Sequence, residues 1–217
     1  MWRNKINNTK IKEKWQNELG IEISDDAWED CISNIHHSSV NARHSLYQFK
    51  IIHRLHFSPS KINKIFPNSS PICGKCSIEQ GTLSHQFVQC HKLQNFGGQL
   101  FDFLTRAFGR DIPLAPLTAL FGMVEPGWAL SKYEVQVISL STLLARKLIL
   151  QAWKSEKTPT INMWLKELGG VLHLERIRFT LSKKEPLFMK IWSPILNLLD
   201  ELWTVLCCPL VTVTVCL

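Results

Sequence analysis

One long stretch of this 217-residue sequence lacks acidic side chains. Between Cys31 and Ile78 there is no Asp or Glu, whereas Lys, Arg and His recur throughout. In a chain of net charge +7, this segregation builds a positively charged surface. Such a surface suits the phosphate backbone of a nucleic acid, because each Lys or Arg contact releases condensed counterions. The alternative is a solvated face that only keeps the protein soluble, but the length of the acid-free stretch favours nucleic acid.

The sequence also lacks a long apolar run. No stretch reaches the roughly 20 apolar residues that cross a bilayer, so we expect no membrane partner. We find no secretory signal peptide, and the cysteine count, seven, is odd. Both observations favour a reducing compartment, the cytoplasm or the nucleus, where thiolates stay free to bind metal. Eight tryptophans and eleven phenylalanines supply large side chains for a core.

Three of the cysteines lie close together with a histidine. Cys73 and Cys76 form a C-x-x-C pair, and His85 and Cys90 follow in the same short segment. Two residues between cysteines let both sulfurs reach one ion, and Zn²⁺ accepts four such ligands in a tetrahedron. The segment therefore predicts a CCHC zinc site, with Zn²⁺ as the cofactor. His91, which follows Cys90 directly, is the alternative fourth ligand.

Two other interpretations of the C-x-x-C pair are weaker. A redox pair would stand in a strand, turn and helix of the thioredoxin kind, and that context is missing. A hydrolytic metal would need an open coordination position and a general base, and a closed set of four ligands offers neither. We therefore predict a structural metal and no enzymatic activity. Within the segment, we expect Thr82 to cap a short helix that carries His85.

Helical periodicity dominates the rest of the chain, and no convincing β-hairpin pattern precedes its final residues. We therefore predict a mainly α fold, an irregular helical domain with a small CCHC zinc loop inserted between helices. The expected helices cover residues 1–20, 24–35, 41–55, 59–66, 93–108, 131–153, 159–168, 172–181 and 185–206.

Particular residues set the expected faces and ends of these helices. The residues expected to point inward are Leu46, Phe49 and Ile52 in the third helix, and Ile62, Ile65 and Phe66 in the fourth. The pair Gly169-Gly170 is expected to end the helix that begins near Pro159.

The chain divides into four expected regions. Residues 1–40 hold N-terminal helices without an assigned role, 41–110 the basic helices and the zinc module, and 111–206 a helical bundle. Residues 207–217 form an apolar tail that alternates Val and Thr, and we expect it to be disordered or non-native.

Basic side chains on the outer faces of the predicted helices are the candidate nucleic-acid contacts. For the last two of them, the alternative is an exposed helix end that favours cations. The candidates are Arg43, Lys50, His53, Arg54, Lys61, Lys64, Arg146 and Lys147.

Several short motifs occur in a fixed order around the four candidate ligands. They are Asn41-Ala42-Arg43, Gln48-Phe49-Lys50, His53-Arg54, Pro59-Ser60-Lys61, Ile65-Phe66-Pro67, Gly81-Thr82-Leu83, Phe121-Gly122, Ala145-Arg146-Lys147, Ile149-Leu150, Trp153-Lys154, Pro159-Thr160, Trp164, Phe188, Trp192 and Pro194. Over about residues 40–196, this order resembles the zinc-binding region at the C-terminal side of reverse transcriptases from non-LTR, LINE-type retrotransposons. The chain lacks the acidic polymerase motif and the endonuclease of that family, so it resembles a truncated fragment. It also departs from the family pattern at Phe87-Val88-Gln89 and Phe96-Gly97-Gly98, where the family often has tryptophan.

The resemblance implies a function as well as a fold. In the intact parent, this region would help to hold the RNA template or the nicked target DNA near the polymerase. The partners expected on this basis are RNA, single-stranded or nicked DNA, and the polymerase part of the parent protein. The alternatives are a structural or protein-interaction domain that docks on the polymerase, or a non-functional relic of the element.

Overall fold

The computed structural model describes residues 2–36, 39, 41–124 and 126–206, and the tail 207–217 lies outside these described residues. Within them, the regular structure is helical except for one isolated antiparallel bridge between Ile72 and Gln80. The predicted mainly α fold is therefore confirmed. The elements are α1 (Trp2–Leu19), α2 (Asp25–Ser33), η1 (Asn34–His36), α3 (Ala42–Ile52), α4 (Pro59–Ile65), η2 (His85–Gln89), α5 (His91–Phe108), α6 (Pro116–Phe121), η3 (Pro126–Trp128), α7 (Lys132–Gln151), α8 (Ile161–Leu181) and α9 (Glu185–Leu206).

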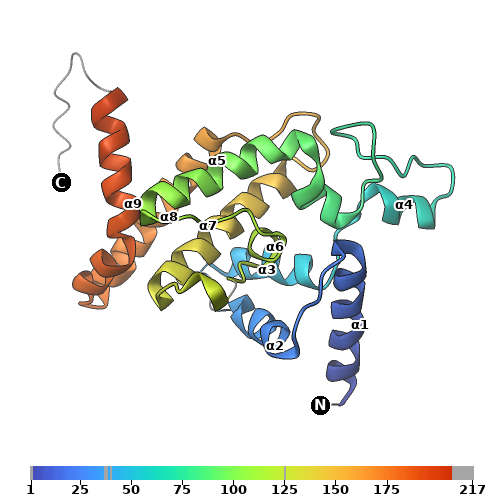
Figure 1. The fold of residues 1–217 in the computed structure, drawn as a ribbon, viewed down its shortest axis with the longest axis horizontal. Coiled ribbons are helices and arrows are strands. Elements are labelled where there is room, and N and C mark those ends of the chain that lie inside the picture. The colour runs from blue at the N-terminus through green and yellow to red at the C-terminus, as the bar shows by residue number, and fades with distance from the viewer. Residues whose placement is uncertain (1, 37–38, 40, 125, 207–217) are drawn as a thin grey trace.

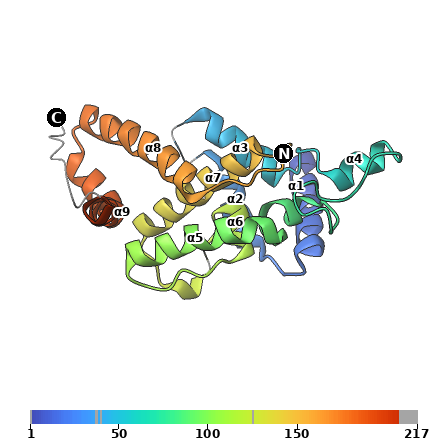
Figure 2. The same ribbon diagram turned by 90° about the horizontal axis from the view of Figure 1, so that it is seen from above.

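Helix α7 is the centre of the arrangement. It contacts α3, α5, α6, α8 and α9. In both views, α1 and α4 lie at one end of the molecule and α8 and α9 at the other (Figures 1 and 2). No helix of the described residues is long and apolar enough to span a bilayer.

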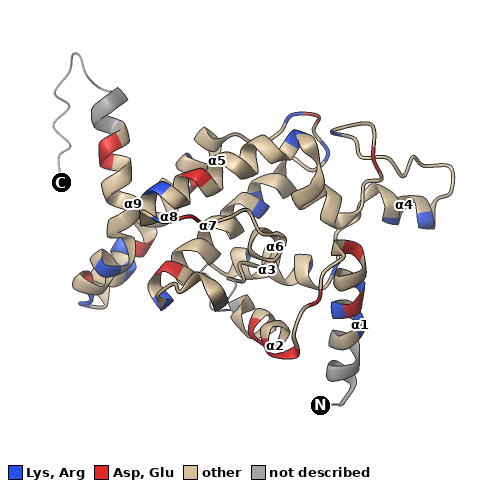
Figure 3. Ribbon diagram, viewed as in Figure 1, with Lys and Arg blue, Asp and Glu red and all other residues tan. Residues whose placement is uncertain are grey.

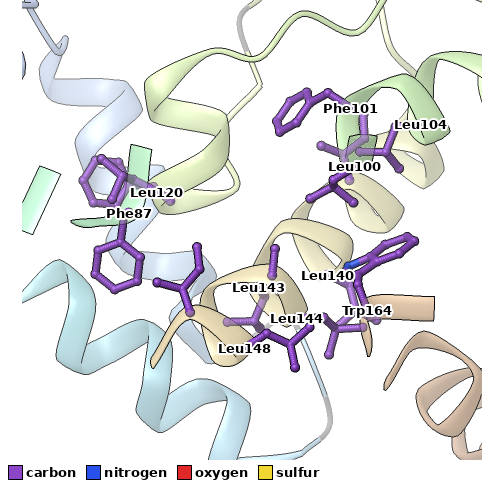
Figure 4. Close-up of a cluster of buried hydrophobic side chains, with 14 of the residues drawn as sticks. Phe87, Leu100, Phe101, Leu104, Leu120, Leu140, Leu143, Leu144, Leu148 and Trp164 are labelled. Atoms are coloured by element: carbon purple, nitrogen blue, oxygen red, sulfur yellow. The ribbon is translucent and has the colours of Figure 1, made fainter. Parts of the chain in front are cut away.

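The hydrophobic core is built around α7, as Figure 4 shows. Helix α7 buries side chains on nearly all sides, as expected for a helix that is enclosed by others. The Trp164 indole of α8 joins this core and donates a 2.9 Å hydrogen bond to the Ser141 carbonyl. The core draws side chains from all three predicted helical regions, whose boundaries stay a prediction. Its labelled members are Phe87, Leu100, Phe101, Leu104, Leu120, Leu140, Leu143, Leu144, Leu148 and Trp164.

Most helix starts carry a hydroxyl or amide cap. Ser24 accepts a hydrogen bond from the Ala27 N–H at the start of α2. Ser131 forms a complete capping box with Glu134 at the start of α7. Because these caps satisfy N–H groups that have no partner within the helix, they define where each helix begins.

One predicted helix break is wrong, because α8 continues through Gly169-Gly170 to Leu181. Both glycines are exposed, and a Cβ on either would meet no atom within 4 Å. On either side of the pair, Leu168 and Leu172 are buried in the core. Burial of this apolar stripe outweighs the low helix propensity of glycine, which is about 1 kcal/mol per residue.

The predicted inner face of α3 is correct at Ile52, which is buried, but wrong at Leu46 and Phe49. Leu46 is 50% exposed and Phe49 is 39% exposed, and the side chains that face the core include His44 and Gln48. Both polar groups find partners: Gln48 Nε2 donates to the Phe121 carbonyl at 3.0 Å, and His44 Nδ1 lies 2.9 Å from Ser39 Oγ. A buried polar side chain is tolerated when it is hydrogen-bonded, so apolarity alone misplaces this face.

Helix α4 buries none of its residues, although an inward apolar face was expected. Ile65 is 51% exposed and Phe66, directly after the helix, is 64% exposed. The helix lies at the edge of the molecule (Figure 1). Its start is held there by Pro59, whose ring packs on Gly81, where an added Cβ would lie 2.7 Å from the ring.

We predict that Gly169→Ala and Gly170→Ala each raise the free energy of unfolding by about 0.5–1 kcal/mol, because alanine lowers the conformational entropy of the unfolded chain without a clash in α8. Urea unfolding followed by circular dichroism measures the change. Gly122→Ala is the matched control and should be destabilising, since Gly122 has a φ of +72° and its Cβ would lie 2.6 Å from Ser139 Oγ. Destabilisation by either α8 variant would contradict a helix that continues through this pair.

Candidate metal centre

A short hairpin-like turn presents the first two candidate ligands. The Cys73 N–H donates to the Glu79 carbonyl at 2.8 Å, and the Gly81 N–H donates to the Pro71 carbonyl at 2.9 Å. Between them, the Ser77 N–H closes the C-x-x-C turn on the Cys73 carbonyl at 2.8 Å. Ser77 itself has a φ of +57°, in the left-handed region where glycine is preferred. This turn places Cys73 and Cys76 side by side.

The other two candidate ligands stand on the connection to α5. The His85 N–H donates to Thr82 Oγ1 at 3.1 Å, so the predicted cap by Thr82 is confirmed. His85 begins the single π-type turn η2, and the Cys90 N–H closes that turn on the His85 carbonyl at 2.8 Å. Cys90 is also the residue from which α5 starts.

The four side chains meet at one point. The ligand atoms of Cys73, Cys76, His85 and Cys90 all lie within 4.8 Å of one another, and all four residues are buried. His85 Nε2 is 3.4 Å from Cys76 Sγ, and His85 Nδ1 is 3.0 Å from a carboxylate oxygen of Glu79. This cluster can hold a metal ion, with Nε2 toward the sulfurs and Nδ1 held by Glu79.

His91, the alternative ligand, is exposed in the first turn of α5 and does not belong to the cluster.

The thiols of the cluster differ in their readiness to ionise. Burial raises the pKa of Cys76, but the N–H groups of Glu79 and Ile78 and the nearby His85 outweigh it, and the pKa lies at about 6. Burial is the largest influence on Cys90 and raises the pKa of its thiol to about 11. A thiol such as Cys90 ionises when a bound cation supplies the compensating charge, which is the behaviour of a metal ligand.

Lys75, between the two cysteines of the C-x-x-C pair, anchors the turn to α7. Its ammonium donates to the carbonyls of Ala152, Ser155 and Lys157 at 2.9, 2.8 and 3.2 Å, just beyond the end of α7. Burial lowers the pKa of Lys75, while Cys73 and Cys90 raise it. From the sequence, Lys75 is only one residue of the basic stretch, because the carbonyls that it binds are distant in the sequence. Its position between Cys73 and Cys76 is the one sequence feature that points to a structural role.

Glu18 of α1 connects the metal segment to the N-terminal helices. One carboxylate oxygen accepts the Ser84 N–H at 2.7 Å, and the other accepts a hydrogen bond from Arg54. Burial raises the pKa of Glu18, but these donors outweigh it and hold the pKa below its usual range. The Arg54 guanidinium also lies 4.2 Å from the centre of the Trp15 ring. Arg54 is therefore fixed by α1, and its charge is largely used inside the protein.

A groove beside the metal segment gathers several of the predicted nucleic-acid residues. It has a volume of about 660 Å³ and lies between α1, the end of α3, α4 and the segment that carries Thr82 and Leu83. Lys14 of α1, which the sequence did not single out, also lines it. The predicted residues in its wall are His53, Arg54, Lys61 and Lys64.

The other predicted contacts are not part of this groove. Arg43 and Lys50 are exposed on α3. Arg146 is only 1% exposed, and its guanidinium donates to the Ala119 carbonyl at 2.7 Å, so the prediction of a surface contact is wrong for this residue. The cause is α6, which packs across this part of α7. Lys147 pairs with Glu167 of α8.

We predict that Lys75→Met lowers the free energy of unfolding by about 2 kcal/mol, because three carbonyls lose a charged donor. Urea unfolding of the metal-loaded protein measures the loss. Lys154→Met removes an exposed lysine near the same helix end and should change the stability by less than about 0.5 kcal/mol. Equal stabilities of the two variants would show that Lys75 does not anchor the turn.

No protein-family model matches the chain. The resemblance to the zinc-binding region of LINE-type reverse transcriptases therefore remains an expectation that its motifs alone support.

Proposed function

We propose that this chain is a zinc-stabilised module that binds nucleic acid without a catalytic site of its own. The observation that carries the proposal is the basic groove, whose wall includes Thr82 and Leu83 from the segment between the candidate ligands. A metal at the cluster would fix this segment, and the segment would in turn fix one wall of the groove. The metal would then support nucleic-acid binding by stabilising the shape of the groove.

The donor set fits zinc. Three thiolates and one imidazole, all buried, form one of the usual structural zinc sets. In a tetrahedral zinc site a sulfur and a nitrogen ligand lie about 3.6 Å apart, and Cys76 Sγ and His85 Nε2 are 3.4 Å apart. Glu79 would orient the imidazole from outside, as carboxylates commonly do for zinc-bound histidines. When bound, zinc would cross-link the turn to the start of α5.

The charges of the groove suit phosphate groups. Lys14 and Lys64 are exposed on two different helices, and Lys61 of α4 is half-buried in the wall. The single acid among the lining residues, Glu18, is already used by Arg54 and the Ser84 N–H. The groove therefore keeps a positive charge, which would supply salt-dependent affinity for a nucleic-acid backbone.

Exposed apolar side chains beside the groove favour a single strand. Leu55 lines the groove and is 47% exposed, and Phe57 is 58% exposed. The Lys61 ammonium lies 4.9 Å from the centre of the Phe57 ring, so a cation and an aromatic face are presented together. Single-stranded nucleic acids are bound in this way, by phosphate contacts and by stacking of unpaired bases on aromatic rings. We therefore propose RNA or single-stranded DNA as the partner.

A second candidate function is docking on another protein, such as the polymerase part of a longer parent. The observation that favours it is the exposure of Ile65 and Phe66 at the end of α4. Apolar side chains of this size at a protein edge are typical of interaction surfaces. Under this alternative, the groove would bind an acidic partner and would show no preference for nucleic acid.

We predict one zinc ion per chain, measured by inductively coupled plasma mass spectrometry after purification without added metal. Cys90→Ser should lose most of the metal and lower the melting temperature, because it removes a ligand and the link to α5. Glu79→Gln should keep the four ligands but weaken zinc binding by about 10-fold or more. Cys31→Ser, at a buried cysteine outside the cluster, is the control and should retain the full zinc content. A metal-free wild-type protein of unchanged stability would reject the zinc site.

We predict that the protein binds a labelled single-stranded RNA with an affinity that falls steeply as salt is raised. Lys14→Gln and Lys64→Gln should each weaken binding and lower the salt slope by about 1, because each removes a phosphate contact. Fluorescence anisotropy across a salt series measures both quantities.

Lys166→Gln, an exposed lysine of α8 outside the groove, is the matched control for charge. Arg54 is unsuitable as a test position because its loss would leave Glu18 without its ion pair. If the control weakens RNA binding as much as the groove variants, the groove is not the binding surface. Zinc binding without RNA binding would favour the docking function.

A further inference from the structure

A second basic hollow lies at the other end of the molecule from the groove. It has a volume of about 440 Å³ and is formed by the first turns of α7, the end of α8 and the start of α9. Lys and Arg segments gather in the region where α8 ends and α9 begins, as Figure 3 shows. The polar side chains of its lining are Lys132, Tyr133, Gln136, Arg178, Ser182 and Lys184.

The charge of this hollow is positive. Its lining includes three cations, Lys132, Arg178 and Lys184, and no acid. Lys132 and Lys184 are exposed, and neither pairs with a carboxylate of the described residues. Arg178 Nη2 is held by Glu175 at 2.6 Å, while Arg178 Nε is buried and has no hydrogen-bond partner among the described residues. The hollow thus presents two ammonium groups without a carboxylate partner, of which that of Lys132 lies over the Tyr133 ring, and a guanidinium held by Glu175.

The helix ends fix the positions of two of these cations. Lys132 is the first residue of α7, and Lys184 directly precedes α9, whose first turns also carry the acids Glu134 and Glu185. The turn between α8 and α9 is tight: Lys183 has a φ of +54°, and the Lys184 N–H donates to the Phe179 carbonyl at 2.8 Å. Lys184 therefore stands on a constrained turn, and Lys132 is fixed at the start of α7.

The remaining wall of the hollow is aromatic and aliphatic. Tyr133 and Phe179 line it, together with Leu187 and Ile191. The ammonium groups of Lys132 and Lys190 lie 5.2 and 5.0 Å from the centre of the Tyr133 ring. A hollow of this volume is in the range of small-molecule sites, which combine an apolar wall with a few polar groups that orient the ligand. It is too large for a phosphate ion alone.

We propose that this hollow binds a phosphate monoester that carries an aromatic group, of which a nucleoside monophosphate is the simplest example. The phosphate lies among Lys132, Arg178 and Lys184, whose charges match a dianion. The aromatic group lies against Tyr133 at the apolar wall of the hollow. The same chemistry is present in a free nucleotide and at the 5′-phosphorylated end of a nucleic-acid strand. The site is separate from the groove and does not depend on the function proposed for it.

Isothermal titration calorimetry of the full, zinc-loaded chain tests the proposal, with AMP, adenosine and inorganic phosphate as probes. We expect AMP to bind and adenosine to give no measurable binding. Inorganic phosphate should compete with AMP for the site, but with a lower affinity than that of AMP. Lys132→Gln and Lys184→Gln should each weaken AMP binding by roughly tenfold, as the loss of one charge-assisted contact does. Arg178 is left intact because it neutralises the buried carboxylate of Glu175.

Two matched controls and one comparison of probes complete the design. Arg176→Gln removes the same charge from the exposed surface of α8, outside the hollow, and should leave AMP binding unchanged. Lys14→Gln, in the groove, should also leave it unchanged. A 5′-phosphorylated oligoadenylate that binds more tightly than AMP would assign the site to a strand end, and tighter binding of AMP would assign it to a free nucleotide.

Several outcomes would overturn the proposal. Equal binding of adenosine and AMP would show that no phosphate is recognised. If Arg176→Gln lowers the affinity for AMP as much as Lys184→Gln does, the effect comes from the overall charge of the protein and not from the hollow. A loss in Lys14→Gln alone would place AMP in the groove and leave the hollow without a ligand.

Discussion

Cys90 joins the candidate metal centre to the helical part of the protein. Its sulfur belongs to the four-ligand cluster, and its backbone is the point from which α5 begins. The segment from Cys73 to Cys90 has little regular structure of its own, only one end of the isolated bridge and the short turn η2. Its position therefore depends on the ligand cluster, the Lys75 ammonium on the carbonyls beyond α7, Glu18 on the Ser84 N–H, and the burial of Leu83 and Phe87 in the core. Since Thr82 and Leu83 form part of the groove, these contacts also determine the shape of the surface proposed to bind nucleic acid.

Much of the positive charge in the sequence is used inside the fold. Arg146 is buried, Arg54 is paired with Glu18, Lys147 is paired with Glu167, and Lys75 is enclosed by carbonyls. A net charge of +7 is therefore a poor guide to the surface. Anions outside the protein meet only the remaining charge, part of which lies in the groove near α1 and α4 and in the hollow between α7 and α9. This sorting of charges is a property of the packing, because each internal cation is satisfied by a group far from it in the sequence.

Features with a local cause could be predicted from the sequence. The ligand cluster follows from short spacings in one segment, and the caps at Ser24 and Thr82 follow from side chains that bond the next turn of backbone. Features that depend on tertiary contacts could not. The helix through Gly169-Gly170 persists because its neighbours are buried, and the inner face of α3 contains Gln48 because the Phe121 carbonyl lies opposite. The burial of Arg146 has the same origin, since α6 covers a helix face that periodicity alone leaves open.

Helix α7 joins the two basic regions and also separates them. Its C-terminal end meets Lys75, so the negative end of its dipole helps to hold the metal segment. Its N-terminal end lies at the hollow, where the positive end of the dipole favours an anion. A helix of 20 residues is about 30 Å long, which is several times the Debye length of about 8 Å at physiological salt. Charges at one end are therefore screened from those at the other. The two regions therefore share the α7 scaffold, while the charges of one have little electrostatic effect on the other.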